Sequence, residues 1–170
     1  MASNIFQGKF LRVVQEEVLL PNGHRTSVDM VFHPGGACVL PIFDNGDILL
    51  IRQYRHAVQN YLWEIPAGKL NLNEDPLACA KRELEEEAGL QAKTWKKLIS
   101  IYTTPGFCDE VLHIYSATGL TQVPTRQEAG EIMTIHRLDR KKIHAMLQQG
   151  EIIDSKTLAA LFVFLNFMVD

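Results

Sequence analysis

Apolar and polar residues along the first part of the chain predict an antiparallel pair of strands. Residues 10–20 and 26–32 alternate loosely between apolar and polar side chains, and the proline, asparagine and glycine at residues 21–23 are a hairpin turn signal. Two strands alone are marginally stable in water, so this unit must pack on something else. We expect a small antiparallel N-terminal sheet at residues 1–36, ahead of a main domain at residues 37–170.

The following segments are more apolar and predict the strands of a larger sheet. Residues 37–43 and 48–55 are apolar strands joined by a clear turn at residues 44–47. Shorter or alternating segments predict further strands at residues 61–65, 96–102, 111–118 and 131–138.

Helices are predicted near the middle of the chain and twice near its end. Residues 139–149 fit a helix with a glycine stop, and a last helix begins at Asp154 or Ser155 and extends to about residue 168. The last helix is apolar nearly all round, so it is buried on several sides, which hints at a subunit interface. The order of elements predicts an α/β protein in which a mixed β-sheet is sandwiched between helices (α/β/α).

The central helix has clear signals at both ends. Asp75 is a good N-cap, Pro76 stands where the first helical residue tolerates a missing N–H, and Gly89 is a plausible left-handed stop. One face carries an apolar stripe that seats the helix on a core, made of Leu77, Ala80, Leu84 and Ala88.

Three carboxylates lie on the other face of this helix. Glu83, Glu86 and Glu87 are spaced i, i+3 and i+4, which places them within reach of one another. Like charges at this spacing repel, so packing does not explain them. Mg²⁺ and Mn²⁺ take oxygen ligands, and carboxylates neutralise them. The alternative is a solvated acidic face with no ligand.

Composition and charge narrow the class of protein. The 170 residues suit about one domain, and a net charge of -3 without any basic run gives no footprint for nucleic acid. The start lacks a signal peptide and the most apolar segment is too short to cross a membrane, so we expect a cytoplasmic protein. The three cysteines stand among apolar or small residues, which favours buried reduced thiols over zinc.

The acidic helix is part of a longer pattern that resembles the Nudix box. Its fixed positions are Gly68, Glu74, Arg82-Glu83-Leu84, Glu86-Glu87 and Gly89-Leu90, without a departure. The resemblance implies the Nudix fold and the hydrolysis of a nucleoside diphosphate linked to another group. It also implies Mg²⁺, for which Mn²⁺ may substitute, because a divalent ion screens the negative diphosphate and polarises it.

The resemblance assigns roles to the residues of the box. Glu83 and Glu87 would be the principal metal ligands, with Glu86 sharing or completing the site and the Ala67 carbonyl as a backbone ligand. Arg82 orients the acidic face, and Arg82 and Glu86 are candidates for the catalytic set. A simple surface charge is the alternative for Arg82.

Residues outside the box resemble the branch of ADP-ribose and nucleoside-diphosphate-sugar pyrophosphatases. Pro105 stands fifteen residues after Leu90, and Arg55 is a candidate ligand for phosphate or sugar, with a salt bridge to Glu64 as the alternative. The remaining candidates for the substrate site are Glu64, Phe107, Glu110 and Lys156. Glu64 and Glu110 are also candidates for contact with the metal or its ligands. Phe107 fits packing better than ligand binding, and Lys156 fits contact with a terminal phosphate.

The same branch uses a glutamate on a loop after the box to activate the attacking water. Glu128 and Glu131 both lie where that residue would be, and Glu131 is favoured. Branch members dimerise by exchanging the N-terminal sheet, so a homodimer is expected.

The predicted reaction is the Mg²⁺-dependent hydrolysis of ADP-ribose or another nucleoside diphosphate sugar into a nucleoside monophosphate and a sugar phosphate. The alternatives are a GDP-mannose-type nucleotide-sugar hydrolase and a non-catalytic Nudix domain that binds ADP-ribose as a sensor. We expect a nucleotide-sugar substrate as partner, and neither nucleic acid nor membrane.

Overall fold

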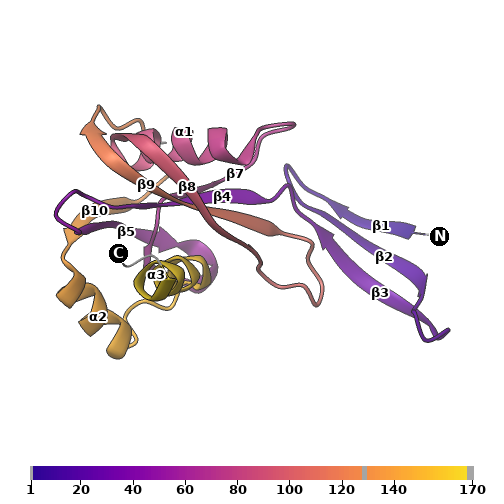
Figure 1. Ribbon diagram of the computed structural model, residues 1–170. Helices are drawn as coiled ribbons and strands as arrows, with labels where there is room; N and C mark the ends of the chain where they lie inside the picture. The colour runs from indigo at the N-terminus through magenta and orange to yellow at the C-terminus, as the bar shows by residue number, and fades with distance from the viewer. Residues whose placement is uncertain (1, 128–129, 168–170) are drawn as a thin grey trace.

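The N-terminal residues form a sheet that stands away from the rest of the molecule (Figure 1). The computed structural model describes residues 2–127 and 130–167. The sheet has three antiparallel strands in the order β1-β2-β3, one more than the sequence predicts: β1 (Ala2–Gln7), β2 (Arg12–Leu19) and β3 (Arg25–Phe32). Among the side chains described for residues 3–32, Val14 alone is buried, so this sheet has almost no core of its own.

Two further sheets form the body of the protein. The four-stranded sheet has the order β7-β4-β9-β8, and its β4–β9 pair is parallel while the others are antiparallel. Its strands are β4 (Gly36–Pro41), β7 (Ala67–Lys69), β8 (Leu90–Tyr102) and β9 (Val111–Gln122). The three-stranded antiparallel sheet, in the order β10-β5-β6, contains β5 (Ile48–Arg55), β6 (Asn60–Glu64) and β10 (Met133–Leu138), with a short 3-10 helix (His56–Val58) between β5 and β6.

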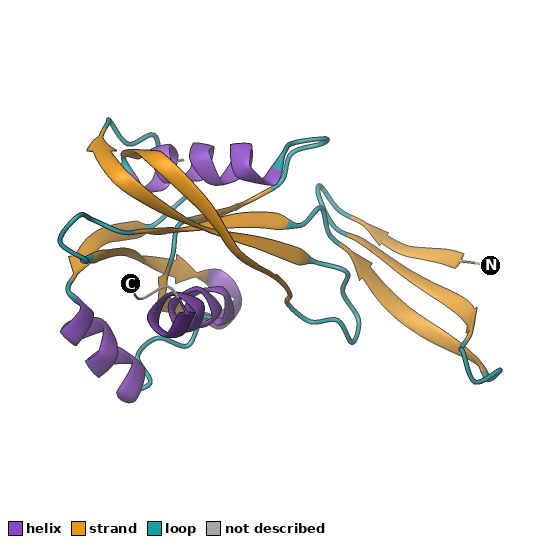
Figure 2. Cartoon of the chain, viewed as in Figure 1, coloured by secondary structure: helices purple, strands orange, loops and turns teal. Residues whose placement is uncertain are grey.

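Helices cover the sheets on opposite sides (Figure 2). Helix α1 (Pro76–Ala88) is on one side, and α2 (Arg140–Gln148) and α3 (Ser155–Phe167) are on the other. None of the helices in the described part of the chain combines the length and the apolar run that crossing a membrane requires. The ends of α1 are those that the sequence predicts, because the Asp75 side chain accepts bonds from Leu77 N and Ala78 N, both at 3.0 Å, and Gly89 has φ 62°.

Strand β4 lies at the centre of the core. All six of its residues are buried, as expected for a strand covered on both faces. Cys38 and Leu40 face the α2 and α3 side, whereas Ala37 and Val39 face α1. The predicted α/β/α arrangement is confirmed, and the cysteines are free, with burial raising the pKa of the Cys38 thiol to about 12. Helix α3 is only partly covered, since Phe162 is 60% exposed.

Candidate active site on helix α1

The acidic face of α1 is held tightly against strand β7. Glu83 and Glu87 are buried, while Glu86 is partly exposed. A Cβ on Gly68 would fall 1.6 Å from Glu83 Oε1, so only glycine leaves room for this carboxylate. The backbone of β7 thus fixes where the α1 carboxylates point.

Arg82 is surrounded by three of the carboxylates of this region. Its Nη1 donates to Glu83 Oε1 at 2.5 Å and to Glu86 Oε2 at 3.1 Å. Its Nε and Nη2 hold both oxygens of Glu74, at 3.0 and 3.2 Å. The bond to Glu74 is the largest cause of a raised Arg82 pKa, and in return it lowers the pKa of Glu74. Arg82 therefore contacts three carboxylates at once, and its role in orienting the acidic face stays a prediction.

Glu87 is a carboxylate without a cation in contact among the described residues. Its Oε2 accepts a bond from Ala67 N at 2.9 Å. Burial raises the pKa of Glu87 to about 8, against that hydrogen bond, and the charges of Glu83 and Glu131 raise it further. Burial is also the main cause of the raised pKa of Glu83. A carboxylate pair of this kind is costly unless a cation joins it.

The donor set suits a hard divalent cation. Glu87 contacts the Ala67 backbone, Glu83 and Glu86 contact Arg82, and the three carboxylates outnumber this single guanidinium. In residues 2–127 and 130–167, however, no three acidic, histidine or cysteine side chains converge in a geometry that would hold an ion. Arg82 bonds to one oxygen of Glu83 and one of Glu86, so the second oxygen of each carboxylate is not used by the guanidinium.

The loop that carries the two candidate bases is fastened to the end of α1. Arg126 N donates to Glu86 O, and Gln127 Nε2 donates to Glu87 O, both at 3.0 Å. Past the loop, Tyr54 N donates to Ile132 O at 2.9 Å, which places the start of β10 beside β5. Glu131 is therefore close enough for its charge to raise the pKa values of Glu83 and Glu87. Glu128 lies outside the described residues.

Arg55 is paired with Glu64, which was the alternative reading of this arginine. Its Nε and Nη2 hold the two Glu64 oxygens at 2.8 and 2.7 Å. The Arg55 side chain is still 41% exposed, and its charge lowers the pKa of Glu87, so it also lies near the α1 face. Burial would raise the pKa of Glu64, but the hydrogen bonds from Arg55 and the charge of Lys156 hold it below its usual range.

Lys156 lies in a different environment from the one expected for a phosphate ligand. It is 7% exposed, and its ammonium contacts the carboxylates of Glu64 and Asp154. Burial would lower the pKa of Lys156, but the charges of Asp154 and Glu64 raise it. The expected contact with a terminal phosphate is therefore corrected: this ammonium is committed to two carboxylates within the protein.

Pro105, Phe107 and Glu110 lie on the loop between β8 and β9, and their described contacts lead to the N-terminal sheet. Val31 N donates to Phe107 O at 2.7 Å. Glu110 accepts a bond from Thr103 Oγ1 at 2.8 Å and lies 3.2 Å from His33 Nδ1. Phe107 is 56% exposed, so it does not fill the core as the sequence suggested. His33 was not singled out, because a histidine before a proline gives only a turn signal.

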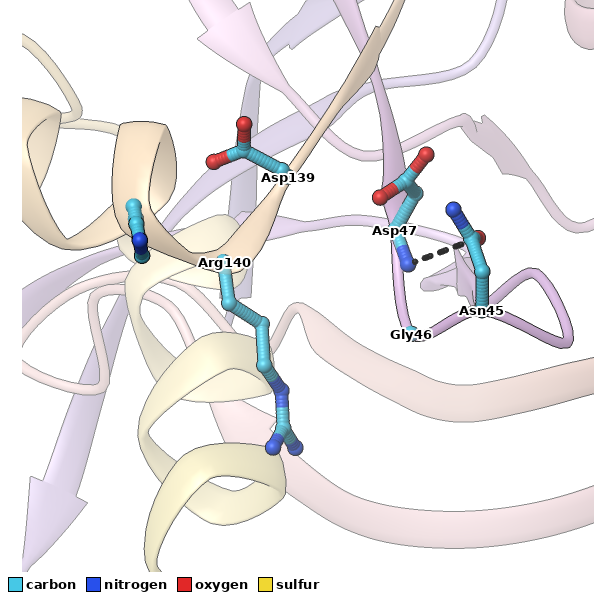
Figure 3. Close-up of a pocket in the computed structure, with 6 residues that line it drawn as sticks. Asn45, Gly46, Asp47, Asp139 and Arg140 are labelled. Atoms are coloured by element: carbon cyan, nitrogen blue, oxygen red, sulfur yellow. Dashed lines mark hydrogen bonds between the residues drawn. The ribbon is translucent and has the colours of Figure 1, made fainter.

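A surface pocket lies elsewhere, between the β4–β5 turn and the start of α2 (Figure 3). Its acidic groups already have partners: Asp47 accepts from Arg137 Nε at 2.7 Å, and Asp139 caps α2 through Lys142 N at 2.7 Å. Asn45 also accepts from the Asp47 backbone at 3.2 Å. The pocket therefore lacks the unbalanced charge that distinguishes the face of α1.

The fold places a carboxylate-rich helix beside a mixed sheet, with side chains whose oxygens suit a divalent cation. Comparison with known proteins names the family. The NUDIX domain pattern matches residues 32–161. This chain therefore belongs to the Nudix family and is a Nudix hydrolase.

Three curated relatives and one solved structure show how close the similarity is. An ADP-ribose pyrophosphatase of Bacillus subtilis is 38% identical, over 92% of this chain and 86% of the relative. A methanol dehydrogenase activator of Bacillus methanolicus is 37% identical, over 92% and 85%. An ADP-ribose pyrophosphatase of Mycobacterium tuberculosis is 35% identical, over 93% and 78%. A crystal structure of an ADP compounds hydrolase has the same fold, with a TM-score of 0.86, 20% identity and coverage of 99% of this chain and 91% of the other.

Proposed function

We propose that this protein hydrolyses ADP-ribose into AMP and ribose 5-phosphate with the help of Mg²⁺ or Mn²⁺. The observation that carries the proposal is the surplus of carboxylates on α1, where Glu83 and Glu87 are buried with raised pKa values and a single guanidinium stands among them. The names of two relatives at 38% and 35% identity support ADP-ribose as the substrate.

The metal would be held by Glu83 and Glu87 with the Ala67 carbonyl, and Glu86 would share it. When bound, a divalent cation screens the charge of the diphosphate and polarises the phosphorus that is attacked. Arg82 keeps Glu83 and Glu86 in place while the site is loaded. This assignment gives a ligand role to each of the three carboxylates on the acidic face of α1, Glu83, Glu86 and Glu87.

The chemical step needs a base and a phosphate ligand from the chain. Glu131 would accept the proton of the attacking water, since the loop that carries it is fastened to α1 next to Glu86 and Glu87. The water oxygen forms a bond to one phosphorus and the bridging P–O bond breaks, so that each product leaves with one phosphate. Arg55 would bind the diphosphate oxygens with the part of its guanidinium that Glu64 does not use.

The N-terminal sheet would complete the enzyme as a dimerisation element. Residues 1–36 carry exposed apolar side chains on a sheet without a core, including Ile5 at 59%, Phe6 at 56% and Phe10 at 47% exposure. A second copy that covers them would bury this surface. Light scattering at micromolar concentration tests this, and a mass of one chain would contradict it.

The activity is tested by following nucleotide release from a panel that contains ADP-ribose, GDP-mannose and UDP-glucose, each with Mg²⁺ and with EDTA. We expect ADP-ribose to be the preferred substrate and EDTA to stop its hydrolysis. Glu85→Gln is a matched control for Glu87→Gln, because Glu85 is on the same helix but pairs with Arg126 outside the acidic face. Preference for GDP-mannose would replace the substrate, and binding of ADP-ribose without hydrolysis would replace the enzyme by a sensor.

A further inference from the structure

The first turn of α3 takes part in a buried cluster of charged side chains that the proposed reaction does not use directly. Lys156 contacts Glu64 and lies 2.9 Å from Asp154 Oδ1. Glu64 is 1% exposed and also holds Arg55. The cluster contains two positive and two negative side chains, so it is balanced without any ligand.

A buried charge cluster is weak evidence for stability, because well-packed apolar residues would serve as well or better. What this cluster provides is a connection between elements that are distant in the sequence. Lys156 and Glu64 are 92 residues apart, and Ile65 N donates to Thr157 Oγ1 at 2.9 Å across the same separation. Helix α3 thus holds the end of β6 through two of its side chains: Lys156 contacts the Glu64 carboxylate, and Thr157 Oγ1 accepts a bond from the Ile65 backbone N–H.

The held segment leads directly to the acidic face of α1. Two residues after Ile65, Ala67 N donates to Glu87 Oε2 at 2.9 Å. On the other side, Glu64 binds Arg55 through Nε and Nη2 only. A guanidinium has five N–H donors in a fixed fork, so Glu64 leaves the two donors of Nη1 unused, and the Arg55 charge is near enough to lower the pKa of Glu87.

We propose that Lys156 is a positioning residue for the substrate diphosphate: it fixes the Glu64 carboxylate in the place from which Glu64 orients the Arg55 guanidinium. This inference rests on the proposed function, in which Arg55 binds phosphate oxygens. Lys156 supplies Glu64 with a second cation, so Glu64 can hold Arg55 by one edge without drawing the whole guanidinium into the core. Without Lys156, the only cation left for the buried Glu64 within the cluster is Arg55, and the arginine turns inward.

The test is a double-mutant cycle that joins Lys156→Met and Arg55→Gln. For wild type and Lys156→Met, we measure KM and kcat for the panel substrate that wild type hydrolyses fastest, and the affinity for its α,β-methylene analogue by calorimetry in Mg²⁺. We expect Lys156→Met to raise KM and weaken analogue binding by about tenfold, while kcat changes by less than about twofold. In the Arg55→Gln background, Lys156→Met has no further effect on KM. Lys156→Arg, which keeps the charge, restores much of the affinity.

Two controls make the outcome decisive. Lys142→Met removes an exposed lysine of α2 and leaves KM unchanged. If Lys156→Met does not fold, Lys156→Met/Glu64→Gln removes one charge of each sign, folds, and raises KM at least as much because Arg55 loses its anchor. An unchanged KM in the folded variant, or equal KM effects in the presence and absence of Arg55, overturns the inference. Failure of wild type to hydrolyse ADP-ribose overturns the substrate instead, and the cycle still runs on whichever diphosphate substrate is turned over.

Discussion

The acidic face of α1 and the charge cluster at the start of α3 differ in how their charges balance. On α1, Arg82 contacts Glu74, Glu83 and Glu86, and Glu87 lies beside them with a raised pKa. At α3, two carboxylates face two cations. In the first arrangement the described carboxylates outnumber the guanidinium, whereas in the second the charges balance within the chain.

The difference separates a ligand site from a structural site, although both consist of buried carboxylates. Burial raises the pKa of Glu87 to about 8, while the pKa of Glu64 is lowered although Glu64 is buried as well. Glu64 contacts two cations, Arg55 and Lys156, whereas Glu87 has no cation in contact among the described residues, and this accounts for the opposite directions of their shifts. Glu83 and Glu87, whose pKa values stay raised because burial outweighs the nearby positive charge, are therefore the candidates for a bound cation.

The largest expected effect comes from removing a charge on the acidic face of α1. Glu87→Gln lowers kcat/KM by about 10²–10³-fold, because Glu87 is one of the proposed principal metal ligands, yet metal-free Glu87→Gln is at least as stable as wild type. Steady-state kinetics and thermal unfolding in EDTA check the two halves. Glu85→Gln keeps near-wild-type activity, and a Glu87→Gln enzyme with full turnover would remove Glu87 from the ligand set.

Removing a charge from the balanced cluster at α3 is expected to lower stability in addition to raising KM. Lys156→Met lowers the free energy of unfolding by about 3–5 kcal/mol, because it leaves buried carboxylates without their shared cation. Lys156→Met/Glu64→Gln recovers most of this loss, since no buried charge is left in excess. Urea unfolding of the metal-free proteins measures both values, and a double variant less stable than the single one would contradict the balanced description.

The two regions are also expected to respond to opposite ends of the pH range. Glu87 has a folded pKa of about 8 against a usual 4.5, so between these pH values the folded state holds a proton that the unfolded state has released, and stability falls as pH rises. Glu64 has a lowered pKa, so its contribution is present above its unfolded pKa and is lost as pH falls through the folded one.

Thermal unfolding in EDTA from pH 5 to pH 9 isolates the Glu87 effect, because the contribution of Glu64 is lost only below its usual pKa of 4.5. Relative to Glu87→Gln, metal-free wild type loses about 5 °C or more of Tm as pH rises to about 8, and saturating Mg²⁺ removes the difference. Parallel Tm curves for the two proteins would show that Glu87 is already neutralised within the chain.

Sequence reasoning worked best where the signals are local. The ends of α1 follow from Asp75, Pro76 and Gly89, which act within one turn of the helix. Strand β1 was missed because its six residues have no clear alternation and are held by pairing with β2. The location of Lys156 could not be predicted either, because its partner Glu64 is 92 residues away and no spacing rule applies at that distance.

The smallest expected effect on activity comes from a substitution of Arg82, which contacts three carboxylates but does not balance their charge. Arg82→Lys keeps the positive charge but replaces a planar fork that serves Glu74, Glu83 and Glu86 by a single ammonium. The carboxylates then lose their fixed orientation, and the Mg²⁺ concentration for half-maximal activity rises about tenfold, as expected for a residue that orients metal ligands. Lys81→Arg, an exposed neighbour on the same helix, leaves that concentration unchanged. An unaltered Mg²⁺ requirement in Arg82→Lys would mean that charge alone, and not the fork geometry, is what the acidic face takes from Arg82.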